Sequence, residues 1–283
     1  MKRVFEIVLI LIAVSLSTAL CSVANARDGI SVMGAYSMWG RVHSIAMAYE
    51  KDHPQVAVSV LSHSLVDQGI QSLIEGKTEV AMASRKITPR EREEAKAKGV
   101  KLDEHLLGYG AVVVITDRQN PVRDLSVERV KEILTGKIVN WKEIGGKDQA
   151  VKVIVASAKL HPGTFYYMEN DILGGAPIAG GAETLPDFPE VVKRVGETPG
   201  AIACVRIRDQ FPGSGARTKV LGIRHDEHSE PVAPARDTIS EGTYPFRQPY
   251  YFYTASTANR QVRSFVEFAV GQGWGQPLLT YVW

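Results

Sequence analysis

The first part of the chain alternates short apolar runs with segments whose apolar residues recur at helical spacing. The runs predict strands at residues 30–33, 56–61 and 80–83. Helical spacing predicts a helix after each of the first two strands, and Thr88-Pro89-Arg90-Glu91 predicts a third that begins with a capping box. This alternation predicts a largely parallel sheet covered by helices. The residues expected to face the core from the first two helices are Met38, Val42, Ile45, Ala46, Tyr49, Ile70, Leu73 and Ile74.

The stretch from residue 108 to 146 predicts a buried strand followed by a capped helix. The unbroken apolar run at 111–116 is typical of a strand covered on both faces. Ser126 is the expected N-cap of the helix, and Gly136 is expected to end it. The tail after Gly136 has no simple periodicity, so its Trp141 indicates a specific local fold. The expected buried face of the helix consists of Val127, Val130, Ile133 and Leu134.

The second half of the chain repeats the alternation with irregular connections. Strands are expected at 151–155, 201–205 and 250–253, helices at 163–173 and 188–195, and a last helix that buries Val262, Phe265, Val266 and Ala269. Glycine and proline mark an irregular loop between the first two of these helices, and residues 219–247 indicate strand fragments and turns. A chain of this size tends to divide its core, so two α/β lobes are favoured over one very wide sheet.

The N-terminus predicts an export signal. Lys2 and Arg3 precede an apolar run at 7–20, and Ala24-Asn25-Ala26 supplies the small residues that a signal peptidase requires. We therefore assign residues 1–26 to a cleavable signal peptide, because the run is short for a membrane span. Lipidation of Cys21 is the alternative, although Leu20 stands where a small residue should precede a lipidated cysteine.

Composition narrows the range of partners. The chain has 283 residues, of which 45% are hydrophobic and 23% charged, as in soluble globular proteins. Removing Lys2, Arg3 and Glu6 with the signal lowers the net charge from +2 to +1, so no strong field favours nucleic acid or an anionic membrane. Cys204 is then the one remaining cysteine, expected to be buried and inert, and no disulfide can form within the chain.

Polar loops follow several of the predicted strands. Ligands of open parallel sheets bind outside the carboxyl ends of strands, where loops lead into helix N-termini. Each serine or threonine can simply cap its own helix, but four such loops together favour a cleft for a small anion or another polar ligand. The four loops are Gly34-Ala35-Tyr36-Ser37, Ser62-His63-Ser64, Ser84-Arg85-Lys86 and Lys159-Leu160-His161-Pro162-Gly163-Thr164.

Several motifs together resemble one family. Residues 125–146, with Ile133-Leu134-Thr135-Gly136-Lys137 and Asn140-Trp141-Lys142-Glu143-Ile144-Gly145-Gly146, are similar to the most distinctive motif of the phosphate-type substrate-binding proteins of ABC transporters, which belong to the periplasmic binding protein superfamily. The resemblance runs from about residue 28 to the end in the same order. Its supporting segments are Gly69-Ile70, residues 80–85, Pro199-Gly200-Ala201-Ile202, Tyr244-Pro245 and Tyr251-Phe252-Tyr253-Thr254.

The resemblance implies an α/β, two-lobed periplasmic binding protein type 2 fold with a cleft between the lobes and crossing hinge strands. The first lobe would comprise residues 27–110, completed by about 235–283, and the second lobe, residues 111–234, would be inserted. Residues 111–116 would enter the second lobe and residues 248–254 would lie near the return crossing. Hinge closure around a ligand is the motion that such an arrangement permits.

The ligand residues of the family transfer only in part. Ser37 and the Met38 backbone match the first ligand loop, and Gly163 and Thr164 match the end of another. Val66 stands where a ligand serine is expected, and Asp67 replaces a glycine and is interpreted as a helix N-cap. Ala158 and Pro162 replace an arginine and a serine. The residues expected to bind the ligand, with replacement charge from Arg85, Lys159 and His161, are therefore Ser37, Met38, Ser64, Ser84, Arg85, Lys159, His161, Gly163 and Thr164.

The sequence gives little support for a metal site or a catalytic site. The sequence His225-Asp226-Glu227-His228 lies in a turn-rich segment without a convincing third metal ligand, so a solvated loop is favoured over a metal site. The glycine-flanked serine in residues 211–215 lacks the strand-turn-helix context of a nucleophile elbow. No paired carboxylates indicate acid-base catalysis, and nothing in the sequence demands an enzyme or a cofactor.

The sequence predicts an exported, periplasmic and monomeric solute-binding protein. It would capture phosphate or a related oxyanion, with phosphate the default by resemblance, and present it to an ABC permease in the inner membrane. The alternative, motivated by Val66, Ala158 and Pro162, is a sensory or interaction protein that keeps the two lobes and has lost the ligand.

Overall fold

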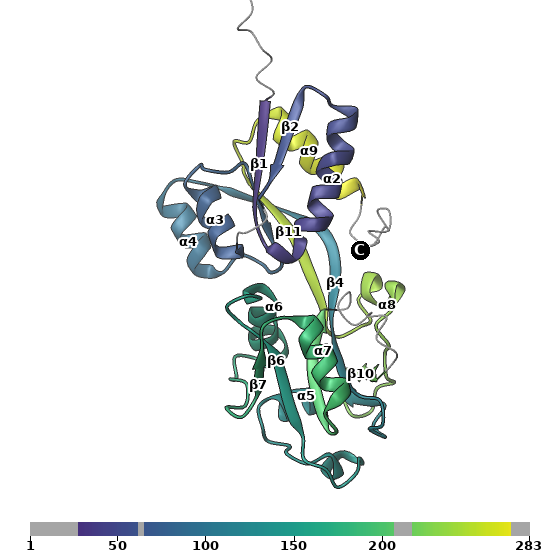
Figure 1. The fold of residues 1–283 in the computed structure, drawn as a ribbon. Coiled ribbons are helices and arrows are strands. Elements are labelled where there is room, and N and C mark those ends of the chain that lie inside the picture. The colour runs from purple at the N-terminus through teal and green to yellow at the C-terminus, as the bar shows by residue number, and fades with distance from the viewer. Residues whose placement is uncertain (1–27, 62–64, 207–216, 273–283) are drawn as a thin grey trace, which may run out of the picture.

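Two α/β lobes are joined by a pair of long strands. A computed structural model of the 283-residue chain describes residues 28–61, 65–206 and 217–272. Strands β4 (Leu102–Asp117) and β11 (Arg247–Ala255) pair antiparallel and run side by side from one lobe to the other (Figure 1). The predicted two-lobed α/β fold with crossing strands is therefore confirmed.

The first lobe is built on three parallel strands in the order β2-β1-β3, with β11 antiparallel at the side of β3. Helices α2 and α9 lie on one side of this sheet and α3 and α4 on the other (Figure 1). The further elements of the lobe are β1 (Asp28–Gly34), η1 (Tyr36–Met38), α2 (Trp39–Asp52), β2 (Val56–Val60), α3 (Val66–Ile74), β3 (Val80–Ala83), α4 (Pro89–Ala97) and α9 (Arg260–Gln272).

The apolar faces predicted for these helices form the core of the first lobe. All eight core residues predicted from the first two helices are buried, and so are the four predicted from the last one. Thr88 caps α4 as expected, since its hydroxyl accepts a hydrogen bond from the Glu91 N–H at 3.2 Å while the Glu91 carboxylate accepts one from the Thr88 N–H at 2.7 Å. Periodicity and capping chemistry were thus sufficient to locate this part of the fold.

Strand β4 is much longer than the apolar run that predicted it. It has 16 residues, and its first half pairs with β11 in the first lobe while residues 112–116 pair with β8 in the second. The first half contains the polar residues Asp103, Glu104 and His105, of which Glu104 is exposed and the other two are half-buried, so this half shows no apolar run in the sequence. Because one strand belongs to both sheets, it carries the chain directly from lobe to lobe.

The second lobe places β8 between β4 and β6, with β7 beyond β6; β8 is antiparallel to β4, whereas β6 is parallel to both β8 and β7. A small parallel pair, β5 and β10, lies beside this sheet, and β9 pairs with β4. The elements are β5 (Asp124–Ser126), α5 (Val127–Leu134), η2 (Trp141–Ile144), β6 (Lys152–Ala156), α6 (Pro162–Tyr167), η3 (Met168–Ile172), β7 (Glu183–Leu185), α7 (Phe188–Glu197), β8 (Ala201–Arg206), β9 (Thr218–Val220), β10 (Gly222–Arg224) and α8 (Arg236–Glu241).

The stretch from 108 to 146 folds largely as predicted. Ser126 caps α5 by accepting a hydrogen bond from the Arg129 N–H at 3.2 Å, and Gly136 follows the helix with φ +80°. Trp141 is 1% exposed, and its indole N–H donates to the Gly200 carbonyl at 2.9 Å. The aperiodic tail therefore places a tryptophan in the core of the second lobe and joins it to the turn before β8.

Three short features of the second lobe differ from the predictions. The helix expected at 163–173 is divided into α6 and the π-helical turn η3. Strand β7 and helix α8 were not predicted, because elements of 3 and 6 residues are too short to show a period. Cys204 is 1% exposed on β8, and burial raises the pKa of its thiol to about 12, which agrees with the prediction of an inert buried thiol.

Each lobe has its own hydrophobic core, and the residues of the two cores indicate where one lobe ends and the other begins. Residues 111–115 belong to the second core, whereas Leu107 and Tyr250 belong to the first. Ile239, Tyr244 and Phe246 also pack in the second core. We therefore propose that the inserted lobe extends to about residue 246, beyond the predicted end at 234. The predicted signal peptide at 1–26, with Cys21, lies outside the described residues.

Candidate functional site

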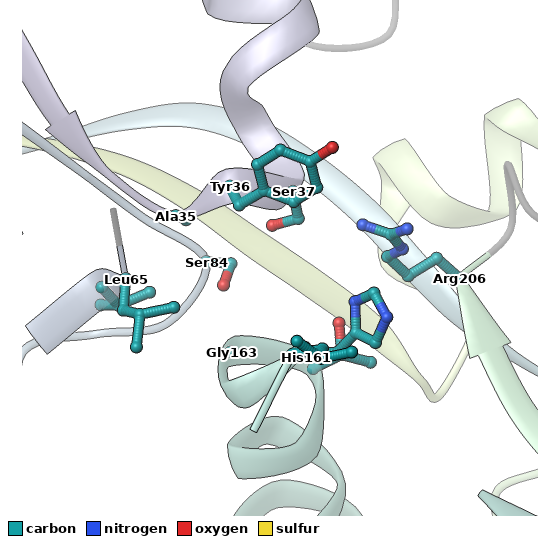
Figure 2. A pocket seen from close by; sticks show the side chains of 11 residues that line it. Ala35, Tyr36, Ser37, Leu65, Ser84, His161, Gly163 and Arg206 are labelled. Carbon is teal, nitrogen blue, oxygen red and sulfur yellow. The ribbon is translucent and has the colours of Figure 1, made fainter. Parts of the chain in front are cut away.

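A small pocket lies where the two lobes face each other. Its volume is about 20 Å³. Figure 2 shows side chains directed into it from both sides, from the loops that follow β1 and β3 and from the segment around α6. Its lining consists of Ala35, Tyr36, Ser37, Leu65, Val66 and Ser84 from the first lobe and Leu160, His161, Gly163, Thr164 and Arg206 from the second.

The wall from the first lobe begins at the end of β1. Gly34 has φ +134°, and a Cβ there would overlap the Met82 carbonyl, so only glycine lets the chain turn this close to β3. The turn leads into η1, which presents Ser37 to the pocket. Met38 does not line the pocket: its side chain is buried in the core, and its backbone N–H donates to the Ala35 carbonyl at 2.8 Å. The structure thus places Ser37, and not Met38, at the pocket.

Ser84 is the most informative polar residue of this wall. It follows β3 directly and is 1% exposed, and the Gln248 side-chain amide donates to its carbonyl at 3.1 Å. Its hydroxyl is buried and has no hydrogen-bond partner within the described part of the chain. An unsatisfied buried hydroxyl costs about 1–3 kcal/mol, so its position at the pocket makes Ser84 a candidate for binding a polar ligand group.

The wall from the second lobe comes from the start of α6 and from the end of β8. Gly163 lies directly opposite Ser84, because a Cβ at position 163 would overlap the Ser84 hydroxyl. Thr164 is 5% exposed, and the His161 ring packs 4.6 Å from the Phe188 ring centroid. The predicted residues His161, Gly163 and Thr164 are therefore brought together with Ser37 and Ser84 at one pocket.

Arg206 also lines the pocket and was not predicted from the sequence. It is the last residue of β8, is 7% exposed, and holds its guanidinium carbon 4.6 Å from the Phe188 ring centroid. The available signal was its position at the carboxyl end of a strand parallel to β6, the edge at which ligands of α/β sheets bind.

Two of the predicted cations lie outside the pocket lining. Arg85 forms two hydrogen bonds of 2.8 Å with the Glu91 carboxylate, and its guanidinium carbon lies 4.9 Å from the Tyr166 ring centroid. Lys159 is exposed on the loop after β6. Arg85 therefore ties the loop after β3 to the start of α4, and Ser64 falls outside the described residues.

The ion pair between Arg85 and Glu91 gives a pH-dependent prediction. Burial alone raises the pKa of the Glu91 carboxyl, but hydrogen bonds from Arg85 and Thr88 and the Arg85 charge together hold it below its ordinary value of 4.5. A carboxyl whose pKa is lower in the folded state stabilises the fold above its unfolded pKa and loses this contribution as pH falls through the folded pKa. Glu91→Gln should therefore lower the free energy of unfolding by about 2 kcal/mol at neutral pH and by much less in acid.

Urea unfolding of wild type and variant between neutral pH and about pH 3 measures this difference. Glu267→Gln, which removes an exposed carboxylate on α9, is the matched control and should leave stability within about 0.5 kcal/mol at every pH. If the free energies of unfolding of wild type and Glu91→Gln differed by the same amount at every pH from neutral to about pH 3, the assigned ion pair would be wrong.

The interpretation of Asp67 as an N-cap is wrong. Helix α3 starts at Val66, Leu65 occupies the N-cap position, and the Leu65 N–H donates to the Gln68 side chain at 3.1 Å. Asp67 lies in the first turn and is exposed, away from the pocket lining. Val66 does line the pocket, with its Cγ2 3.6 Å from the position that a Cβ of Gly163 would take. The start of α3 therefore presents a methyl group where the resemblance implies a hydroxyl.

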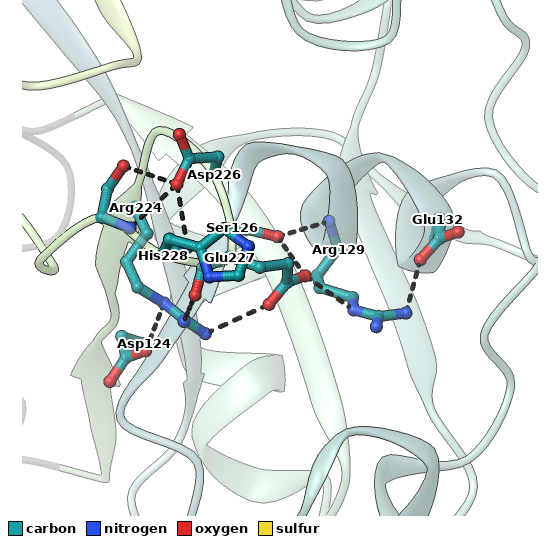
Figure 3. Close-up of polar contacts among 9 residues, drawn as sticks. Asp124, Ser126, Arg129, Glu132, Arg224, Asp226, Glu227 and His228 are labelled. Carbon is teal, nitrogen blue, oxygen red and sulfur yellow. Dashed lines mark hydrogen bonds and ion pairs between the residues drawn. The ribbon is translucent and has the colours of Figure 1, made fainter.

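The acidic residues of the His225–His228 segment are engaged in local contacts (Figure 3). Asp226 accepts hydrogen bonds from the backbone N–H groups of His228 and Ser229, both at 2.8 Å. Glu227 accepts one from the Ser126 hydroxyl at 2.9 Å and pairs with Arg129 at 3.0 Å, which fastens this turn to the N-terminus of α5. Within the described residues no group of three or more His, Cys, Asp or Glu side chains is arranged to hold a metal ion.

Comparison with known proteins identifies the family. A sequence model of the PBP superfamily domain matches residues 22–272. The chain belongs to the PBP superfamily. Two curated relatives of this PBP-superfamily chain are named phosphate-binding protein PstS: the protein of Staphylococcus saprophyticus is 25% identical over 85% of this chain and 73% of its own length, and that of Staphylococcus haemolyticus is 24% identical over 81% and 72%.

Solved structures support the same fold. An ABC-type phosphate transport receptor from Vibrio cholerae superposes with a TM-score of 0.71 at 24% identity, covering 85% of this chain and 93% of that one. A putative phosphate ABC transporter substrate-binding protein with bound phosphate, from Clostridium perfringens, gives a TM-score of 0.65 at 22% identity, covering 85% and 92%. Across the described ranges, no helix has the length and apolar character needed to cross a membrane.

Proposed function

We propose that this PBP-superfamily protein is a solute-binding protein that captures phosphate or a related oxyanion and delivers it to an ABC transporter. The observation that carries the proposal is the buried Ser84 hydroxyl, which has no hydrogen-bond partner among the described residues and faces Gly163 of the other lobe. A tetrahedral anion between the lobes would accept a hydrogen bond from this hydroxyl and hold the lobes together. The phosphate-binding relatives and receptors favour the same ligand class.

Export and assembly follow from the same proposal. The mature protein would begin after the signal peptide at 1–26 and act in the periplasm as a monomer, docking on a permease in the inner membrane. A lipid anchor at Cys21 is the alternative form, and mass spectrometry of the mature N-terminus distinguishes the two. We propose no catalytic activity for the cleft and expect no turnover of a generic phosphomonoester.

Calorimetric titration of the mature protein with phosphate, sulfate, molybdate and tungstate tests the ligand. At least one of these anions should bind with a dissociation constant in the micromolar range or below, a binding free energy of about −8 kcal/mol or stronger. The bound anion should also raise the melting temperature, because it binds only the folded protein. Absence of both heat and thermal shift with all four anions would overturn the transport proposal.

A sensory or interaction protein without a small ligand is the second candidate. It is favoured by the pocket volume of about 20 Å³ and by the Val66 methyl group in the lining. A cavity of this size holds about one water, so a tetrahedral anion requires the side chains of the lining to adjust. A crystal grown without added ligand that contained an anion in a closed cleft would exclude this second candidate.

A further inference from the structure

Arg206 lies at the pocket between the lobes, near the point where the chain crosses from one lobe to the other. It ends β8, and in the antiparallel pairing with β4 it stands opposite Val112, close to the point where β4 crosses between lobes. Strand β6 runs parallel to β8, so the loop with His161 leaves the sheet at the same edge. Figure 2 shows the Arg206 guanidinium directed from this edge toward the pocket, near the His161 ring.

The guanidinium lies in a preorganised setting. Phe188, at the start of α7, packs against both Arg206 and His161, with its ring centroid 4.6 Å from the Arg206 Cζ and 4.6 Å from the His161 ring. Phe188 is itself 1% exposed, so it forms a fixed support within the core. A planar guanidinium held on an aromatic ring loses little conformational freedom when it binds a ligand.

Burial strengthens the electrostatic attraction between the Arg206 guanidinium and an anion. Arg206 is 7% exposed, and Leu160, Val66 and Leu65 contribute apolar surface to the same pocket. An anion bound beside this buried guanidinium interacts with it more strongly than it would in water. The other buried arginine near the cleft, Arg85, does not line the pocket. Arg206 is the one arginine or lysine among the described residues that line it.

We infer that Arg206 is the charged residue that binds the oxyanion in the cleft. Its guanidinium presents parallel N–H donors to two oxygens of the anion, a geometry that suits a tetrahedral oxyanion. The Ser84 and Ser37 hydroxyls donate to the remaining oxygens from the first lobe. One anion thus bridges a cation of the second lobe and two hydroxyls of the first, so binding favours the closed arrangement. The inference rests on the proposed function and assigns its principal binding residue.

Titration of phosphate and sulfate into wild type, Arg206→Gln, Arg206→Lys and Arg85→Gln tests the assignment. Arg206→Gln should lose on the order of 100-fold in affinity for the better anion, because a buried charge partner is removed. Arg206→Lys should lose about 10-fold, since a point charge remains without the planar fork. Arg85→Gln should lower the melting temperature, because it leaves Glu91 unpaired, but change affinity by no more than about threefold.

The possible outcomes distinguish a wrong assignment of Arg206 from a wrong proposal of the transport function. Anion binding by wild type together with unchanged affinity of a folded Arg206→Gln would overturn the role of Arg206 and leave the transport function standing. No anion binding by wild type would overturn both. If Arg206→Gln does not fold, a crystal structure of the wild type with phosphate decides: the assignment holds if a phosphate oxygen lies within hydrogen-bonding distance of the Arg206 guanidinium, and it is wrong if the anion contacts other residues only.

Discussion

Gly69→Ala should destabilise the first lobe by about 3 kcal/mol, although alanine is the better helix former. Gly69 lies on the buried face of α3. A Cβ there would lie 2.6 Å from the Gly34 Cα, 2.7 Å from the Met33 carbonyl oxygen and 2.9 Å from the Gly34 nitrogen. These are backbone atoms of β1, so no change of rotamer relieves the overlap, and α3 would have to move away from the sheet. Urea unfolding should show a lower midpoint with an unchanged slope.

Gly40→Ala provides the matched control for this prediction. Gly40 is also a helical glycine of the first lobe, on α2, but no atom of the described residues lies within 4 Å of the position that its Cβ would take. Alanine should therefore stabilise the protein there by about 0.5–1 kcal/mol. Equal effects of the two substitutions would show that helix propensity alone matters and that the close approach of α3 to β1 does not.

The contact at Gly69 also illustrates what the sequence could reveal about the fold. Periodicity located α3 and identified Ile70, Leu73 and Ile74 as core residues, because these features are local. The close approach of Gly69 to Gly34 joins positions far apart in the chain, so it could not be derived from spacing. The same holds for β4: its buried half was predicted from composition, but its continuation through polar residues depends on pairing with β11, which follows much later in the sequence.

The structure brings the predicted loop residues to one pocket and leaves two of the predicted cations outside its lining. Ser37, Ser84, Gly163 and Thr164 lie together there because loops after strands of a parallel sheet converge on one edge. Arg85 was predicted to bind the ligand because it follows a strand. In the structure its guanidinium instead donates hydrogen bonds to Glu91, the carboxylate of the predicted capping box. A long charged side chain can reach in several directions, and its partner is decided by packing that local sequence does not encode.

Arg206 lines the pocket but was not predicted to do so. Residues 201–205 predict a buried strand, and the residue that ends such a strand at the ligand-binding edge is a candidate site residue by its position alone. What the sequence could not supply was Phe188, which lies on α7 and supports the guanidinium. The position of the Arg206 side chain thus depends on a contact between elements that are separate in sequence, which the loops predicted at the edge of the sheet do not reveal.

Gly163→Val should abolish tight anion binding without unfolding the protein. A Cβ at position 163 would overlap the Ser84 hydroxyl, and its γ-methyl groups would also meet Val66 and the Ser84 Cβ, which lie 3.6 and 3.8 Å from that Cβ position. Rotation of the Ser84 hydroxyl could relieve the first overlap alone, which is why valine is a sharper test than alanine. The closed arrangement should become less favourable by about 3 kcal/mol, which lowers apparent affinity on the order of 100-fold.

Gly180→Val is the matched control, since Gly180 is an exposed glycine of the same lobe and no atom in the described part of the chain lies within 4 Å of its Cβ position. Small-angle X-ray scattering with and without phosphate should show contraction of wild type and Gly180→Val on binding and none for Gly163→Val. Both variants should melt close to the wild type, because Gly163 is only half-buried and Gly180 is exposed. If Gly163→Val bound phosphate and contracted like the wild type, the approach of Gly163 to Ser84 would not be the contact that closes the cleft around its ligand.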